Sequence, residues 1–406
     1  MLFGLAYQNL WRNRRRTLLT MSAMVVSVSL LILALGIFSG MFKDMLASAT
    51  EQYYGHLVMA KPDYHQRRDL YATLPDTILT LPTLQNPEIL GRAPRLRSFG
   101  LVSWGQTSQP VELLGIQPLA EATVTSLHDQ IVKGRFLEET DKNCLIIGWG
   151  LAEKLNVRPG DAVVFVTQAA DGSIGNDLLT ITGIFRTGDR RHDNNLVLAP
   201  LTWLQNLLVL PGRIHEVSMR IHNPMTASVL ASRINAELNT EATILDWGEL
   251  LPEMREVISA YDVSRLIVVI ILYLATGLGI LNTFFMSVME RTREFGILLA
   301  QGMRPWLIRQ LVLLEAMILA IMSLIIGMFL GGLMTFYMDQ VGIDLSKYIT
   351  PVTYAGGTIL PRLHAVFDLG NFLTPAIVLL MVSLAASYLP ANRAAKLNPV
   401  VAIREE

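Results

Sequence analysis

The sequence predicts a membrane protein that combines four transmembrane α-helices with one large α+β domain on one side of the membrane. First, 51% of the 406 residues are hydrophobic and only 17% are charged, which is too apolar for an ordinary soluble protein of this size. Second, three long runs contain no charged residue and a fourth contains only Glu315. Each run is long enough to cross the hydrocarbon core, which needs about 20 apolar helical residues. Third, a long segment with strand and helix patterns separates the first run from the second.

The first transmembrane helix, residues 17–42, has some features of a signal peptide. Four arginines precede it, and the pattern Ala-Ser-Ala follows it at residues 47–49. Its apolar run is much longer than a signal-peptide core of about 7–15 residues, so we expect an uncleaved anchor. We expect its helix to continue outward into MFKDMLASATEQ, and LPEMREVISAYDVSR to lead as a helix into the second span. The remaining predicted transmembrane helices are residues 261–289, 306–338 and 369–392.

The distribution of basic residues predicts the orientation, because Lys and Arg are enriched in short cytoplasmic loops. The N-terminal segment, residues 1–16, contains four arginines, and the stretch from Glu290 to Arg309 contains four more. The tail, residues 393–406, has three basic residues, whereas the loop 339–368 has two. We therefore expect both termini in the cytoplasm and the long segment 43–260 outside.

The outside segment, residues 43–260, changes its pattern twice. Residues 53–129 and 201–250 predict an α+β layer, because YYGHLVMA indicates a strand and HEVSMRI is followed by a helical stretch and then by EATILDW. Residues 130–200 contain short β-branched runs separated by turn signals such as RPGD and ADGS, which predicts a β-rich insertion. Cys144 is the only cysteine, so no internal disulfide can form and the domain must be stabilised by its own core.

The sequence has no pattern that indicates a catalytic or metal site. There is no G-x-x-x-x-G-K-[ST] phosphate loop, so the chain cannot hydrolyse ATP by that route. The seven histidines are scattered, with no H-E-x-x-H motif and no Cys/His cluster. We expect no catalytic residue, no metal and no cofactor in this chain.

The stretch ERTREFGILLAQG, residues 290–302, directly follows the second span and has the pattern of an amphipathic helix. Phe295, Leu298, Leu299 and Gly302 follow helical spacing and share one face, while charged residues occupy the others. Two interpretations fit this pattern. The helix could lie on lipid headgroups, or it could dock on a cytoplasmic partner.

Three stretches of the chain resemble permeases of the MacB, FtsX and lipoprotein-release type. They are NLWRNRRRTLLT (9–20), ERTREFGILLAQGMRPWLIRQLVLLEA (290–316) and YLPANRAAKLNPVVAIREE (388–406). In the outside segment, VKGRFLEETDKNCLIIGWGLAEKLNVRPGDAVVFV (132–166) and LLTITGIFRTG (178–188) resemble the same family. The resemblance spans nearly the whole chain, and it looks closest to the lipoprotein-release branch.

The resemblance implies a type VII ABC transporter permease of the bacterial inner membrane. Such permeases work as dimers, with an identical or homologous second permease and two copies of a separate ATPase that binds ATP and Mg. The stretch 290–305 would be the coupling helix that docks on this ATPase. The implied docking residues are Glu290, Arg291, Glu294, Phe295, Leu298, Leu299 and Gly302. In the periplasmic domain, residues 53–129 and 201–250 would be porter-like and residues 130–200 sabre-like.

The lipoprotein-release branch implies an apolar client, a lipoprotein in the first place, that leaves the outer leaflet of the inner membrane. An acyl chain gains about 0.8 kcal/mol for each buried CH₂, so such a client needs an apolar shelter. The candidate cavity residues lie on the outward extensions of the first two spans: Met41, Phe42, Met45, Leu46, Ile258, Tyr261 and Leu266. Ordinary packing between two helices is the alternative interpretation.

Other functions stay open at this point. A permease of the same superfamily can drive tripartite efflux or regulate an envelope enzyme, and a membrane-anchored sensor can bind a ligand outside without ATP. The lipoprotein-release interpretation allows a periplasmic carrier as a further partner. It implies no binding of nucleic acid.

Two features inside the predicted spans bear on helix packing. Gly36 with Gly40, and Gly327 with Gly331 and Gly332, form small-xxx-small patterns that permit close approach of helices in lipid. Glu315 is an ionisable residue inside a span. We expect it either to snorkel or form a local hydrogen bond near the inner interface, or to take part in coupling.

Overall fold

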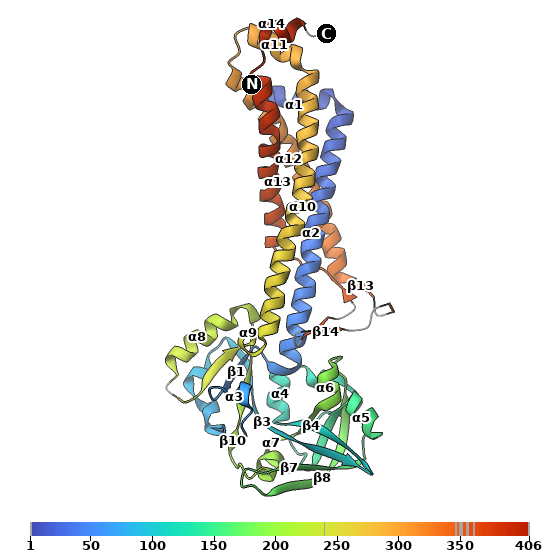
Figure 1. Cartoon of the computed structure of the whole chain (residues 1–406), viewed down its shortest axis with the longest axis vertical. Helices are drawn as coiled ribbons and strands as arrows, with labels where there is room; N and C mark the ends of the chain where they lie inside the picture. Colours follow the sequence, from blue (N-terminus) through green and yellow to red (C-terminus); the bar gives the residue numbers. More distant parts are fainter. Residues whose placement is uncertain are drawn as a thin grey trace. The chain divides into compact units, whose positions relative to one another are not determined.

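The computed structural model describes residues 2–238, 240–345, 347–348, 352–354, 357–359 and 362–404. The chain forms two compact units (Figure 1). The helical unit comprises Met1–Phe42, Ser259–Tyr348 and Pro361–Glu406, and the sheet unit comprises Lys43–Ile258 with Ile349–Leu360.

The described helical unit contains all or most of seven helices. They are α1 (Leu2–Arg12), α2 (Arg14–Ala49), α10 (Pro252–Glu290), α11 (Thr292–Ala300), α12 (Pro305–Gln340), α13 (Gly370–Ala395) and α14 (Pro399–Arg404). By length and composition α2, α10, α12 and α13 can cross a membrane, in agreement with the four predicted spans. The helices α2 and α10 are longer than the predicted spans, because charged residues end an apolar run without ending a helix.

Small residues bring α2 and α12 close together. A Cβ atom added at Gly327 would lie 2.9 Å from the Val28 side chain, and one at Gly331 would lie 3.1 Å from the Ile32 side chain. The Ser29 hydroxyl donates a hydrogen bond to the Gly327 carbonyl oxygen at 3.0 Å. The predicted close approach of helices is therefore confirmed at these two glycines.

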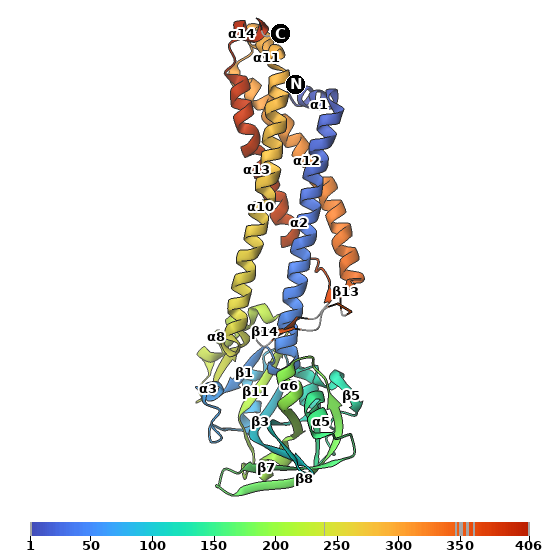
Figure 2. The same cartoon turned by 45° about the vertical axis from the view of Figure 1, so that its right-hand side comes forward.

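The N-terminal segment folds as α1, a helix that the basic charge pattern did not predict. Its buried residues Ala6 and Leu10 lie on the side from which α1 packs on α12. The chain then turns at Asn13 into α2, and the Thr17 hydroxyl donates to the Leu10 carbonyl oxygen at 2.6 Å across this turn. Figure 2 shows α1 beside the start of α2.

The sheet unit is built on a ten-stranded mixed sheet with the order β12-β1-β11-β3-β4-β9-β6-β8-β5, and β7 pairs with both β3 and β8. Its strands are β1 (Leu57–Ala60), β3 (Ile89–Trp104), β4 (Thr107–Ile116), β5 (Ile131–Gly134), β6 (Cys144–Gly148), β7 (Ala162–Gln168), β8 (Ile174–Phe185), β9 (Leu196–Pro200), β11 (Glu216–Ile221) and β12 (Thr243–Asp246). Helices α3 (Tyr64–Arg67), α4 (Pro118–Val124), α5 (Trp149–Leu155), α6 (Arg190–Asn195), α7 (Leu201–Leu207), α8 (Ala227–Glu237) and α9 (Trp247–Leu250) accompany it.

Short two-stranded pairs complete the described strands. They are β2 (Leu74–Pro75) with β10 (Arg213–Ile214), β13 (Ile343–Asp344) with β16 (Arg362–Leu363), and β14 (Val352–Tyr354) with β15 (Gly357–Ile359). The other described strands of the sheet unit belong to the ten-stranded sheet.

The strands of residues 130–200 do not form a sheet of their own. The strand β9 pairs in parallel with β4, where Leu198 lies opposite Leu114, and β7 pairs with the end of β3, where Val166 lies opposite Leu101. Because β3 is 16 residues long, its first half pairs with β11 and its second half with β7. The predicted α+β layer and the predicted β-rich insertion thus share one sheet.

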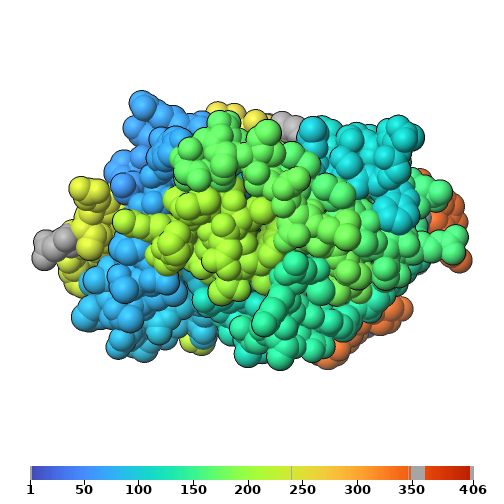
Figure 3. Space-filling view, turned by 90° about the horizontal axis from the view of Figure 1, so that it is seen from below, coloured from blue at the N-terminus to red at the C-terminus, as the bar shows by residue number. Residues whose placement is uncertain are grey.

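On one face of the sheet unit the β7–β8 turn is hydrogen-bonded to two other segments. The Ala170 N–H donates to the Leu208 carbonyl oxygen at 3.0 Å, and the Tyr71 hydroxyl donates to the Ala170 carbonyl oxygen at 3.1 Å. Figure 3 shows this face, with the turn in green and the segment after α7 in yellow-green. Contacts with both neighbours hold the turn in place.

Candidate functional site

The helix α11 lies inside the predicted stretch 290–305 and ends at a glycine turn. The Met303 N–H donates to the Leu298 carbonyl oxygen, and the Gly302 N–H donates to the Leu299 carbonyl oxygen, both at 3.0 Å. These two bonds form a Schellman motif, and Gly302 has φ +90°, which favours glycine. Gly302 therefore has a structural role, which is to end α11.

The apolar face of α11 packs inside the chain. Phe295 is fully buried in the core of the helical unit, and Leu298 and Leu299 pack against the same core. Among the other helices, α11 contacts α14 most extensively. Phe295 is therefore not accessible to a partner, whereas Leu298 and Leu299 are half-buried, and for them the expected docking stays a prediction.

The opposite face of α11 is the one that a partner can reach. Ile297 is 42% exposed, and Arg293, Ala300 and Gln301 are exposed beside it at helical spacing. At the start of α12, Trp306 is 45% exposed. This mixed apolar and basic face was not predicted, although it lies within the predicted coupling helix.

A buried carboxylate fixes the start of α11 to the other helices. Glu315 of α12 is buried, and the Arg291 Nη1 atom donates to both of its carboxylate oxygens at 2.9 Å. The Asn9 side-chain amide of α1 donates to the same carboxylate at 2.7 Å. The local hydrogen bond expected for Glu315 is present, and it joins α1, the α10–α11 turn and α12 at one point.

Further ion pairs surround this carboxylate. Arg12 lies 2.6 Å from Glu294, and Arg291 lies 3.2 Å from Glu294. Burial alone would raise the pKa of the Glu294 carboxyl, but hydrogen bonds from Arg12 and Arg291 lower it. Arg16 pairs in the same way with the exposed Glu290. We define the α11 node as Asn9, Arg12, Arg291, Glu294 and Glu315.

A polar cavity of about 170 Å³ lies next to the α11 node. Residues of α1, α2, α10 and α12 line it, among them Thr17, Thr283 and Ser287. A cavity of this size and polarity has room for several waters.

Four of the predicted client-cavity residues belong to the helical unit. Tyr261 lies edge-on to Phe38 with ring centroids 6.3 Å apart, so α2 and α10 are neighbours at this level. Met41 and Phe42 are half-buried, and Leu266 is exposed. Each of these side chains keeps some surface that another molecule can contact.

The other three predicted client-cavity residues belong to the sheet unit. Ile258 is half-buried, whereas Met45 and Leu46 are buried. Buried side chains do not line an open wall, so the prediction is corrected for Met45 and Leu46. Their apolar atoms contribute to packing around the end of α2.

The described part of the chain offers neither a cluster of metal ligands nor a reactive thiol. Within it, no group of three His, Cys, Asp or Glu side chains could hold a metal ion. Burial raises the pKa of the Cys144 thiol, so this group stays protonated at neutral pH.

Two family models match the chain. Residues 17–237 match the MacB-like periplasmic core domain, and residues 266–399 match the FtsX-like permease C-terminal region. The first match alone covers more than half of the sequence. The chain belongs to the MacB/FtsX permease superfamily. It is a multi-pass ABC transporter permease with a MacB-like periplasmic domain.

Named relatives place this MacB/FtsX permease near the lipoprotein-release branch. The lipoprotein-releasing system transmembrane protein LolC of Neisseria meningitidis serogroup B is 20% identical, over 96% of this chain and 94% of its own length. The corresponding LolE of Haemophilus influenzae is 24% identical, over 78% of this chain and 77% of its own length. The macrolide export ATP-binding/permease protein MacB of Neisseria gonorrhoeae is 21% identical, over 100% of this chain and 61% of its own length.

Proposed function

We propose that this permease transmits the motion of a separate ABC ATPase and releases lipoproteins from the outer leaflet of the bacterial inner membrane. The observation that carries the proposal is the environment of α11. Its inner face, with Phe295, is packed into the helical unit, and Arg291 fixes its start to Glu315. A helix held in this way moves together with α1 and α12 when a partner presses on its exposed face.

The proposed partners are two copies of the ATPase, which bind ATP and Mg, and a second permease that is identical or homologous. The LolC relative, which matches over 94% of its own length, is named as a transmembrane protein, and this chain has no phosphate loop; both support an ATPase on another chain. The exposed residues Arg293, Ile297, Ala300 and Gln301 would contact the ATPase.

The proposed orientation puts both termini and α11 in the cytoplasm and residues 43–260 in the periplasm. The basic residues of the N-terminal segment, of the α10–α12 connection and of the tail support it. Within one continuous sheet, residues 53–129 and 201–250 would be the porter-like part and residues 130–200 the sabre-like part. A periplasmic carrier would receive the client there.

The proposed client is a lipoprotein, and the names of the LolC and LolE relatives support this choice. Its acyl chains would contact Phe42, Tyr261, Leu266 and Ile258, with the flexible Met41 adapting to their shape. Each of these five side chains is at least partly exposed.

Site-specific photo-crosslinking tests the client proposal directly. A photo-reactive residue at Phe42 or Ile258 should capture acylated protein in membranes, and ATP should lower the yield. A photo-reactive residue at Ile174, which is 76% exposed on β8, is the matched control. Capture of acylated protein at Ile174 and not at Phe42 or Ile258 would contradict the proposed client surface.

Export of a small molecule is the second candidate, because the MacB relative matches over 100% of this chain. Under this alternative, the same crosslinkers would capture no acylated protein, and the complex would lower the accumulation of a macrolide in cells. A measurement of both quantities in the same strain separates the two functions.

A further inference from the structure

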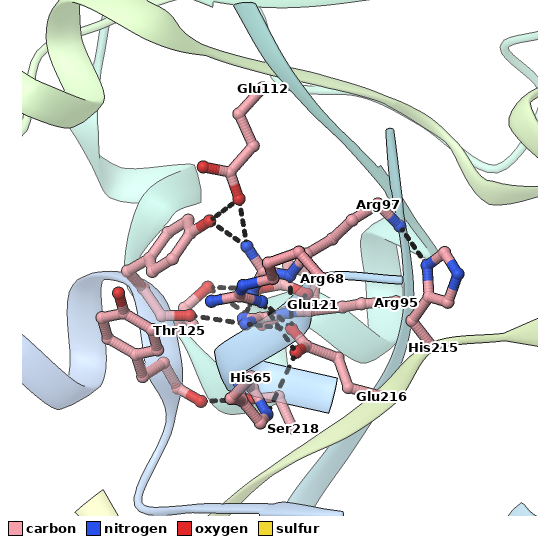
Figure 4. Close-up of polar contacts among 12 residues, drawn as sticks. His65, Arg68, Arg95, Arg97, Glu112, Glu121, Thr125, His215, Glu216 and Ser218 are labelled. Atoms are coloured by element: carbon pink, nitrogen blue, oxygen red, sulfur yellow. Dashed lines mark hydrogen bonds and ion pairs between the residues drawn. The ribbon is translucent and has the colours of Figure 1, made fainter. Parts of the chain in front are cut away.

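The segment that follows α2 is fixed to the sheet by buried arginines (Figure 4). It is η1 (Thr50–Tyr54), which continues α2 in helical form. The Arg95 Nη1 atom donates to the Tyr53 carbonyl oxygen at 2.6 Å. The Tyr53 hydroxyl donates to Glu112 at 2.7 Å and contacts the Arg97 guanidinium. Both arginines come from β3, so the end of α2 is bonded directly to a long central strand.

Carboxylates from three other elements hold these arginines: Glu121 and Glu216 are buried, and Glu112 on β4, which pairs with Arg97, is half-buried. Arg95 donates to both carboxylate oxygens of Glu121 on α4, at 3.0 and 2.5 Å. Arg97 donates to Glu216 on β11 at 2.5 Å. Burial alone would raise the pKa of the Glu216 carboxyl, but Arg97 holds it well below its usual range, so it stays ionised. We define the α2 clamp as Tyr53, Arg95, Arg97, Glu112, Glu121 and Glu216.

Main-chain contacts next to the α2 clamp restrict the same segment further. The Ser126 N–H donates to the Glu51 carbonyl oxygen at 2.8 Å, and Ser218 bonds to the Tyr54 carbonyl oxygen. At Gly55, φ is +77° and an added Cβ would lie 2.5 Å from the Ser218 Oγ atom. The chain therefore passes from η1 into β1 through a space that admits only glycine.

The start of α10 is attached to the same unit in a different way. It follows β12, a strand at the edge of the sheet, through the single-turn helix α9, which has a capping box of Asp246 and Glu249. Arg255 lies 3.5 Å from Asp246, but its side chain is 59% exposed. Asp246 is buried, but Glu249, Glu253, Arg255 and Glu256 are exposed. An ion pair with one exposed partner is screened by water, so this attachment yields more easily than the α2 clamp.

We propose that α2 is the link that moves the sheet unit and that α10 is the link that yields. A movement of α2 acts on β3, β4, β11 and α4 together, because the α2 clamp bonds Tyr53 to all four through Arg95 and Arg97. A movement of α10 acts on one edge strand across the turn at Leu251. Arg95 and Arg97 are thus positioning residues for transmission. This inference rests on the proposed function, in which ATP-driven motion of the helical unit reaches the periplasmic domain.

Hydrogen exchange on the full-length chain in detergent tests the attachment without any partner. Backbone amides of residues 50–56 should exchange at least about 100-fold more slowly than those of residues 249–255, because opening them requires breaking the α2 clamp. The variant Tyr53→Phe keeps the ring and loses the hydroxyl contacts. It should therefore reduce the difference in exchange rate between the two segments. Equal exchange of the two segments in the wild-type chain would overturn the inference.

A pair of matched insertions tests transmission in the complex with the co-purified ATPase. Two glycines are inserted after Ala49 in one variant and after Leu250 in the other. Spin labels at Ile174 and Asp339, in a Cys144→Ser background, report the ATP-dependent change in distance between the two units. The insertion after Ala49 should abolish this change while ATP hydrolysis continues, and the insertion after Leu250 should keep at least about half of it.

The outcomes separate this inference from the proposed function. Equal responses of the two insertions, with hydrolysis intact, would overturn the inference alone. A wild-type chain that carries no ATP hydrolysis would overturn the proposed function. Thermal unfolding of each variant tests whether its sheet unit is folded. If the insertion after Ala49 does not fold, the same distance measurement on Tyr53→Phe replaces it as the test of the α2 link. With Tyr53→Phe, a smaller distance change supports the inference and an unaltered one overturns it.

Discussion

The α2 clamp and the α11 node are both built from arginine–carboxylate pairs, yet they differ in burial. Arg97 and Glu216 of the α2 clamp are each 1% exposed, whereas Arg291 and Glu294 of the α11 node are 12% and 43% exposed. A buried pair cannot lose one partner without leaving an uncompensated charge, while an exposed pair is screened by water. The α11 node also has a buried pair, Arg291 with Glu315, whose side chains are 12% and 4% exposed. The comparison teaches that the buried pairs of both regions hold their geometry, whereas the outer pair at Glu294 can break at little cost.

Loss of the central carboxylate of the α2 clamp should have the largest effect on stability. Glu216→Ala leaves Arg97 without its buried counter-charge, which costs about 3–5 kcal/mol of unfolding free energy. The matched change in the α11 node, Glu294→Ala, should cost less than about 1 kcal/mol because that side chain is partly exposed. Thermal unfolding of the full-length chain in detergent measures both. Equal losses would contradict the difference between the two regions.

Acidification should weaken the sheet unit through His65, which lies 3.6 Å from Glu216. Burial lowers the pKa of His65 from 6.5 to about 4. Between these values the unfolded chain binds a proton that the folded chain does not bind. The free energy of unfolding therefore falls as the pH falls through this window, by up to about 1.4 kcal/mol per pH unit.

The variant His65→Gln should flatten the pH profile of unfolding between pH 6.5 and about 4. Burial also lowers the pKa values of His56 and His215, so part of the slope should remain. His128→Gln, at a more exposed histidine, is the control for the loss of one histidine side chain. A profile for His65→Gln identical to that of the wild type would refute this assignment.

A smaller effect is expected at the turn that ends α11. Gly302→Ala places a Cβ atom at φ +90°, which should cost about 1–2 kcal/mol although there is open space around it. Gly279→Ala, inside α10 and equally open, should instead stabilise the chain by up to about 1 kcal/mol. Unfolding temperatures that shift in the same direction for both variants would rule out the proposed role of Gly302.

The sequence predicts the four spans well and the burial of the α11 faces poorly, for a physical reason. The length of an apolar run is a local property, so it fixes a span without knowledge of the rest of the chain. Helical periodicity found the apolar face with Phe295, but whether that face is covered depends on α14, about a hundred residues further along. Ile297 lies outside the apolar stripe, so helical periodicity did not mark it as a contact residue.

The α2 clamp could not be predicted from the sequence, because its charges come from distant segments. Arg95 pairs with Glu121, 26 residues away, and Arg97 pairs with Glu216, 119 residues away. In a strand pattern these arginines look like ordinary polar positions. Glu315 is different, because a single charge inside an apolar run indicates a buried partner by itself.

The central claim is that the exposed face of α11 docks an ABC ATPase. Of the substitutions discussed above, Ile297→Asp should change the unfolding temperature least, because this side chain is 42% exposed. The decisive measurement is vanadate-sensitive ATP hydrolysis by the complex purified through a tag on this chain. Val229→Asp, at a residue 68% exposed on α8, is the matched control. We predict loss of hydrolysis for Ile297→Asp and full hydrolysis for Val229→Asp, whereas full hydrolysis by a folded Ile297→Asp complex would contradict the claim.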